Sequence, residues 1–228
     1  MHLSKTFFKS VVIHNLGLQP YNAAMTTMKN IIQRKIRQKD TKEEDQRDCM
    51  LLCQHNPVYT VGIRTKDYMD ETVVEKLRSL NADYVYADRG GLITYHGPGQ
   101  LVCYPILNLK NYNLSLRCYI HKLEEVVMET CHHFGVTTQR TNDIGLWIGD
   151  NKIAAIGVHC QRHVTSHGLA LNCNTDLSWF SHIVPCGLHG KSVTSLTQEI
   201  ERNVSVEETV PVLLANFKDI FNCDFVNE

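Results

Sequence analysis

Helical periodicity is clearest in two segments of the chain. Over residues 116–134, apolar side chains recur every three or four positions, and Gly135 follows where a helix would end. A second helix is predicted from Ser205, because Glu208 stands in capping-box register with it and apolar residues follow toward Ile220. Pro211 fits poorly inside that helix, which leaves its start open.

Strand patterns separate these helices. Runs rich in aromatic and β-branched residues predict strands, and two apolar segments flank the turn Gly149-Asp150-Asn151, which predicts a β-hairpin. The predicted strands cover 11–16, 57–63, 83–88, 144–148, 152–159 and 168–172, and further helices are expected at 21–37 and 70–80. Without a regular βαβ rhythm, this order favours an α+β fold with a mixed sheet and flanking helices. No repeat or linker divides residues 11–228, so we expect one domain there.

Composition excludes several classes of partner. The chain has 228 residues, of which 43% are hydrophobic and 21% charged, with a formal net charge of −1. A neutral total gives no basic field for nucleic acid. No apolar run reaches the roughly 18–20 residues of a membrane-spanning helix, so we expect no integral membrane segment.

The first residues allow two interpretations. Up to Asp40 the chain carries Lys and Arg but no Asp or Glu, as in an organelle transit sequence. Alternatively, the core begins with the strand at 11–16, which confines a targeting or disordered leader to residues 1–10.

Nine cysteines with irregular spacing favour reduced thiols over a disulfide framework. His159, Cys160, His163 and His167 lie close together, and Cys131 begins a second group with two histidines. A non-catalytic zinc or redox module is therefore one alternative. Because adjacent strand residues point to opposite faces, a shared site for His159 and Cys160 is disfavoured, and we predict no metal.

Three segments combine glycines with reactive or polar side chains. The first, at 89–105, reads RGGLITYHGPGQLVCYP. The second begins with Lys152 at the start of an otherwise apolar strand, where an ordinary hairpin lysine would be a solvated edge charge. In the third, Cys186 lies between Pro185 and Gly187 outside any apolar periodicity, which favours an exposed turn, where a reactive thiol must lie.

Together these segments resemble one family, the octanoyl-(acyl carrier protein):protein octanoyltransferases of lipoate biosynthesis, in their eukaryotic mitochondrial form. The resemblance rests on RGGLITYHGPGQ (89–100), KIAAIG (152–157), SHGLALN (166–172) and PCG (185–187). It implies a fold like the catalytic domain of biotin and lipoate protein ligases. It also implies that Cys186 is the nucleophile and Lys152 its partner. The substrate-binding residues that it implies are Arg89, Gly90, Gly91, Leu92, Ile93, Thr94, Tyr95, His96, Ala155, Ile156, Gly157, Gly168, Leu169 and Ala170.

The implied reaction moves an octanoyl group from octanoyl-acyl carrier protein, through a Cys186 thioester, to the acceptor lysine of lipoyl domains, as the first step of protein lipoylation. The implied acceptors are the lipoyl domains of 2-oxoacid dehydrogenase complexes and the glycine cleavage H protein, in the mitochondrial matrix. No cofactor is required, because the thioester is already activated. The alternative within the same fold is an ATP-dependent lipoate-protein ligase, which has no need of the Cys186 and Lys152 pair.

Two further expectations concern the surroundings of the site. The glycines at 90, 91, 157 and 168 would leave room beside the strands for an acyl chain. Because both macromolecular partners of the implied family are acidic, a basic rim is expected around the mouth. The candidates for that rim are Arg89, Arg162 and Lys191.

Overall fold

The computed structural model describes residues 9–38, 47–64, 71–183 and 190–226. Its large sheet consists of β1 (Ser10–Gln19), β2 (Asp48–His55), β6 (Gln100–Ile106), β7 (Leu146–Ile148), β8 (Asn151–Gln161), β9 (Val164–Asn172), β10 (Ser192–Val193) and β11 (Asp224–Val226). The order is β10-β8-β9-β6-β2-β1-β11, and β7 pairs with β8 off this path. β1 runs parallel to β2 and β11, and β10 runs parallel to β8, whereas the other pairs are antiparallel. The mixed sheet confirms the α+β prediction.

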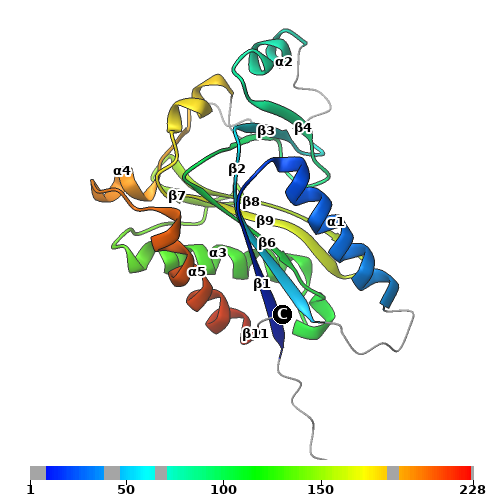
Figure 1. The fold of residues 1–228 in the computed structure, drawn as a ribbon. Coiled ribbons are helices and arrows are strands. Elements are labelled where there is room, and N and C mark those ends of the chain that lie inside the picture. Colours follow the sequence, from blue (N-terminus) through cyan, green and yellow to red (C-terminus); the bar gives the residue numbers. More distant parts are fainter. Residues whose placement is uncertain (1–8, 39–46, 65–70, 184–189, 227–228) are drawn as a thin grey trace, which may run out of the picture.

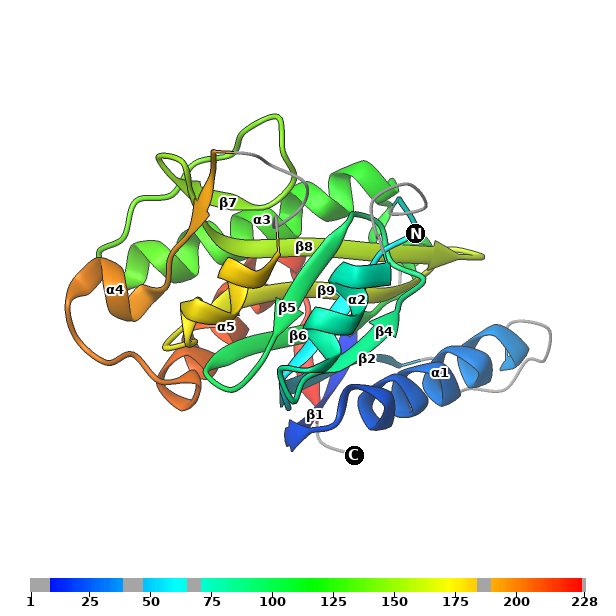
Figure 2. The ribbon, with the colours of Figure 1, turned by 90° about the horizontal axis from the view of Figure 1, so that it is seen from above.

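Both faces of this sheet are buried. Along β2, Met50 and Leu52 belong to the core beneath α3 (Leu116–His133) and α5 (Val206–Phe221). The alternate residues Leu51 and Cys53 belong to a second core beneath α1 (Tyr21–Gln38). This alternation follows from the two-residue period of a strand. Figures 1 and 2 show α3 and α1 on opposite sides of the large sheet.

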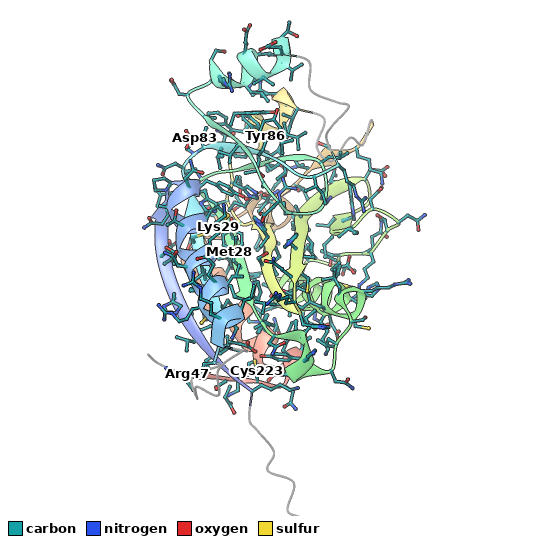
Figure 3. All side chains as sticks on the ribbon, turned by 90° about the vertical axis from the view of Figure 1, so that its right-hand side faces the viewer. Met28, Lys29, Arg47, Asp83, Tyr86 and Cys223 are labelled. Atoms are coloured by element: carbon teal, nitrogen blue, oxygen red, sulfur yellow. The ribbon has the colours of Figure 1, made fainter. Side chains whose placement is uncertain are left out.

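A small sheet stands over one end of the molecule. In it, β3 (Val58–Val61) lies between β4 (Asp83–Tyr86) and β5 (Ile93–His96). A third apolar cluster fills the space between this sheet, α2 (Glu71–Arg78) and the 3-10 helix η2 (Leu177–His182). Figure 3 shows Tyr86 of the small sheet and Cys223 near opposite ends of the molecule.

The predicted helices and their capping agree with the structure in most details. Gly135 follows α3 with φ +78°. Ser205 caps α5 by accepting a hydrogen bond from Glu208 N. The capping box is only half formed, however, because the Glu208 carboxylate instead pairs with Arg202 at 2.7 Å. Pro211 lies inside α5 after all.

The predicted hairpin is also present, as β7 and β8 joined at Gly149, which has φ +56°. Both β8 and β9 extend beyond their predicted bounds, to Gln161 and from Val164. The remaining elements are the 3-10 helix η1 (Leu109–Tyr112) and the short helix α4 (Leu196–Ile200). β1 starts at Ser10, and residues 1–8 lie outside the described part, so the leader at 1–10 stays a prediction. Within the described ranges, none of the helices is both long and apolar enough to span a bilayer.

Candidate active site

An open cavity of about 560 Å³ is lined by residues of α1, α3 and strands of both sheets. Its walls include Tyr21, Val102 and Tyr104, which also belong to the core beneath α1. Most of the residues predicted for substrate binding line it together. These are Arg89, Gly90, Gly91, Leu92, Thr94, His96, Ala155, Ile156, Gly157, Gly168, Leu169 and Ala170. Lys152, which was predicted as catalytic, also lines it. The volume falls within the range of small-molecule sites.

Two predicted substrate-binding residues are not among the described residues that line this cavity. Ile93 and Tyr95 alternate with Thr94 and His96 along β5, and they pack into the apolar cluster behind the small sheet. Tyr95 stacks on Trp179 there, with ring centroids 5.2 Å apart. Both residues therefore support the wall of the cavity instead of contacting its contents. Cys186 lies in 184–189, outside the described residues.

Arg89 holds the first motif in place. Its guanidinium donates to the carbonyl oxygens of Gly90 and Leu92 at 3.0 Å, and to the backbone and side-chain oxygens of Thr60 at 2.8 and 2.7 Å. Only 8% of the residue is exposed. Arg89 thus joins the loop before β5 to β3. It cannot serve as part of a docking rim, which corrects that expectation.

At two glycines of the motifs, neighbouring protein atoms already fill the space that a side chain would occupy. A Cβ on Gly157 would lie 2.9 Å from Cδ of Arg89, and a Cβ on Gly168 would meet the carbonyl oxygen of Cys103. These two glycines line the cavity, but the space beside them is filled by the neighbouring loop and strand. Gly90 differs, because a Cβ there would meet only the Val158 carbonyl oxygen, at 3.5 Å. The expectation of acyl room beside Gly157 and Gly168 was wrong.

Lys152 is buried, with 6% of the residue exposed. Its Nζ lies 4.9 Å from the centroid of the Trp147 ring, a cation–π contact. The backbone of Gly145 packs against the lysine stem, so a Cβ there would lie 2.6 Å from Cε of Lys152. Gly145 has φ +122°, a conformation open to glycine but hardly to other residues. Lys152 is therefore a fixed group in the cavity wall, and the solvated-edge interpretation is wrong.

The segment before β7 completes this wall and was missed in the sequence. Asn142, Asp143 and Ile144 all line the cavity. Asp143 accepts a hydrogen bond on its carbonyl oxygen from Trp147 Nε1 at 3.1 Å, and its carboxylate pairs with Lys191 at 3.0 Å. No periodicity or glycine motif marks this loop, because distant parts of the chain determine its position.

The side chain of Glu124 on α3 anchors the same loop through hydrogen bonds. Its carboxylate is buried, accepts from Arg140 Nε at 3.0 Å, and accepts from the Gly145 backbone N–H at 3.5 Å. A carboxylate inside an apolar helix face was a signal that sequence reasoning could have used, since buried acids are normally paired.

Polar aromatic groups gather around Tyr21 and Tyr104, away from Lys152. His55 Nε2 and Tyr104 Oη lie 2.7 Å apart, and the side chains of His96 and Gln100 are joined at 2.7 Å. Burial lowers the pKa of His96 to about 3 and the pKa of His55 to about 4, so both imidazoles are neutral at pH 7.

His167 adds a hydrogen-bonded imidazole to the cavity wall. Its Nε2 lies 2.7 Å from the Asp88 carboxylate. The hydrogen bond from His167 lowers the pKa of Asp88 to about 2. His167 has φ +55° and donates its backbone N–H to Met28 Sδ at 3.3 Å, which ties β9 to α1. Figure 3 labels Met28 on α1.

The described cysteines differ from what a reactive thiol requires. All eight are free thiols, and five are buried. Burial raises the pKa of Cys53 and of Cys131 to about 12. A thiol is reactive when its pKa is depressed in a polar, partly exposed setting. Within the described ranges, no group of three or more His, Cys, Asp or Glu side chains is positioned to hold a metal ion.

The expected basic rim also changes. Arg162 lies at the turn between β8 and β9, at the opposite end of β8 from Lys152. Lys191 lies beside the cavity but is paired with Asp143. Arg64 instead lines the mouth and is exposed, together with the exposed apolar side chains of Leu116 and Ile144.

Comparison with known proteins identifies the family to which the chain belongs. A family model described as the lipoyl protein ligase A/B catalytic domain matches residues 20–218, and the chain belongs to this family. A mitochondrial octanoyl-[acyl-carrier-protein]:protein N-octanoyltransferase of Danio rerio is 49% identical, over 98% of this chain and 96% of that protein. The corresponding Homo sapiens protein is 49% identical, over 78% of each chain. An octanoyltransferase of Bacteroides fragilis is 48% identical, over 70% of this chain and 75% of its own.

Solved structures share the fold at low sequence identity. A lipoate-protein ligase A bound with ATP has a TM-score of 0.71 at 14% identity, covering 97% of this chain and 88% of the other. A putative lipoate protein ligase from T. acidophilum has a TM-score of 0.70 at 16% identity, covering 96% and 88%. These likenesses bear on the fold alone and confirm the predicted architecture.

Proposed function

We propose that this chain, an enzyme of the lipoyl(octanoyl) transferase type, carries an octanoyl group on Cys186 with the assistance of Lys152. The observation that carries the proposal is the burial of Lys152 in the cavity wall against Trp147. Lys191, five residues after Cys186, also contacts Trp147, with its Nζ 4.4 Å from the ring centroid. Chain length alone therefore allows the thiol to reach this wall, since five residues span at most about 17 Å.

The reaction proceeds in two acyl transfers. The Cys186 thiolate attacks the carrier thioester, a new C–S bond forms and the C–S bond to the carrier breaks. The carrier leaves as a thiol with the proton that the Lys152 ammonium gives up, so Lys152 becomes neutral. The amine of the acceptor lysine then attacks acyl-Cys186, the amide forms, and Cys186 leaves as a thiolate. Lys152, when neutral, accepts the proton that the amine loses. Its ammonium form stabilises the thiolate by charge.

The donor and acceptor are an acyl-carrier thioester and lipoyl domains in general, as the names of the relatives indicate. We propose 2-oxoacid dehydrogenase complexes and the glycine cleavage H protein as the particular acceptors. The compartment is mitochondrial by the same relatives, and we propose the matrix within it. An ATP-dependent ligase is not favoured, because the relatives that are 48–49% identical to this chain are octanoyltransferases.

Mass spectrometry tests the covalent step directly. Incubation with octanoyl-carrier protein should add one octanoyl group to Cys186, and adding a lipoyl domain should remove it. Cys186→Ser should show neither event, whereas Cys118→Ser, a change at an exposed cysteine, should show both. Full transfer by Cys186→Ser would overturn the proposal. Transfer that requires free octanoate and ATP would favour the ligase instead.

A further inference from the structure

The last residues of two sequence motifs meet inside the large sheet. Gln100 ends the motif at 89–100 and Asn172 ends the motif at 166–172, and they are strand partners on β6 and β9. Both side chains are buried, and Gln100 Nε2 donates to Asn172 Oδ1 at 2.9 Å. Neither residue is among the described residues that line the main cavity. Contact with the substrate therefore does not explain these two amides.

Two backbone oxygens determine how the amides are oriented. Asn172 Nδ2 donates to the Thr194 carbonyl oxygen at 2.9 Å. Gln100 Nε2 also donates to the Tyr95 carbonyl oxygen, at 3.3 Å. Because a carbonyl oxygen can only accept, each amide turns its own oxygen away from these groups. Gln100 Oε1 lies 2.7 Å from His96 Nδ1, so the imidazole is the donor there, and the bonds run in one direction from His96 to Thr194.

Thr194 follows β10 and holds the backbone of Lys152. Its N–H donates to the Lys152 carbonyl oxygen at 3.0 Å, and the residue before it, Val193, is the strand partner of Lys152. In the sheet, β8 lies between β9 and β10. The Asn172 amide therefore joins two strands across the strand that carries the lysine.

The position of β10 depends on few residues. It is only two residues long, shorter than most strands, so a side-chain bond at its end matters to its register. Lys191 immediately precedes it and places Nζ 4.4 Å from the centroid of the Trp147 ring, which Lys152 also contacts. A small cavity of about 10 Å³ is lined by Lys152, Gln100 and Asn172 among others, so the amides lie close to the lysine. A shift of β10 would thus disturb both the backbone of Lys152 and the ring beside its ammonium group.

We propose that Asn172 is a positioning residue for acyl transfer, which keeps Lys152 in place through its hydrogen bond to the end of β10. This inference rests on the proposed function. Misplacing a reacting group by about 1 Å can slow a reaction by roughly a hundredfold. Because Asn172 is not among the described residues that line the main cavity, its loss should lower kcat and spare KM for the carrier.

Asn172→Ala removes the donor to Thr194. We expect kcat for octanoyl transfer to fall about ten- to a hundredfold, with KM for octanoyl-carrier within about twofold of the wild type. Asn172→Leu, which also lacks the donor but fills the space, should behave alike and serves if the alanine variant does not fold. The matched control is Asn174→Ala, at an exposed asparagine bonded to the Asn203 side chain, and it should keep the wild-type kcat.

Amide hydrogen exchange distinguishes this role from a general loss of stability. In the Asn172 variants, the Thr194 N–H should exchange about tenfold or more faster, while amides in the middle of β9 change less. Wild-type kcat in a folded variant, or a change confined to KM, would overturn the inference. Equal acceleration of exchange at Thr194 and throughout β9 would also overturn it, by showing a structural role alone. If the wild type itself transfers no octanoyl group, the proposed function fails instead.

Discussion

Nζ of Lys152 lies 4.9 Å from the ring centroid of Trp147, and the same ring donates through Nε1 to the carbonyl oxygen of Asp143. The indole thus joins the cavity lysine to the loop that closes the cavity. β10 adds a second constraint, because Val193 pairs with Lys152 and Thr194 N donates to the Lys152 carbonyl oxygen at 3.0 Å. The lysine is held through both its side chain and its backbone.

Trp147→Phe should lower the rate of acyl transfer by roughly three- to thirtyfold. The smaller ring weakens a cation–π contact that contributes about 0.5–2 kcal/mol and removes the bond to Asp143. The decrease should appear in kcat more than in KM, since Trp147 is not among the residues that line the cavity. Single-turnover acylation provides the measurement. Trp179→Phe, at a tryptophan that stacks on Tyr95, is the control and should keep the wild-type rate.

Gly145→Ala should impair transfer beyond its effect on folding. The new methyl group would collide with Lys152, and the alanine backbone would have to adopt a strained φ. We therefore expect the free energy of unfolding to decrease by about 1–3 kcal/mol. Gly149→Ala is a matched control at positive φ, with no atom within 4 Å of the added Cβ. Thermal denaturation and transfer rates of both variants separate the two effects. Equal activity in the two variants would show that the contact between Gly145 and Lys152 is unimportant.

Alkylation of Cys186 should depend on the charge at Lys152. At pH 7, Lys152→Met should slow modification by iodoacetamide several-fold or more, because it removes a cation that favours the thiolate. Lys218→Met, in an exposed pair with Asp224, should leave the alkylation rate unchanged. Peptide mapping identifies the modified cysteine. Identical rates for all three proteins would mean that Lys152 does not activate the thiol.

The free energy of unfolding should decrease as the pH falls from the ordinary pKa of histidine to the lowered pKa of buried His55. Burial depresses its pKa from 6.5 to about 4, so between these values the unfolded chain binds a proton that the folded chain does not. The unfolding free energy should therefore decrease as pH falls from 6.5 to about 4, by about 3 kcal/mol from this residue. His55→Gln should flatten that slope in urea titrations, whereas exposed His163→Gln should not.

The sequence located the cavity well because its motifs lie on adjacent strands. Within these motifs, residues 154–157 of β8 pair with residues 168–171 of β9, so the two segments form one wall of the cavity. Tyr21 could not be predicted as a site residue, because it looks like an ordinary apolar residue of a helix, and only the packing of α1 against distant strands brings it to His96. Trp147 pairs with Lys152 across the hairpin that the sequence predicts, so the hairpin placed it near the lysine, but no pattern marked its ring as a contact of Nζ. Arg89 was misjudged for a related reason: its oxygen partners on Thr60 come from another strand.

The pairing of β1 with β11 has a consequence for how the chain is made. Ser10 pairs with Asp224, so the outermost pair of strands at this edge of the large sheet joins positions about 200 residues apart. Contacts of such long range close slowly, because the chain between them must first be ordered. During synthesis the outer edge of β1 stays open until β11 emerges, and an open strand edge invites pairing with another copy. The nascent chain therefore has most need of chaperone protection while that last strand is still missing.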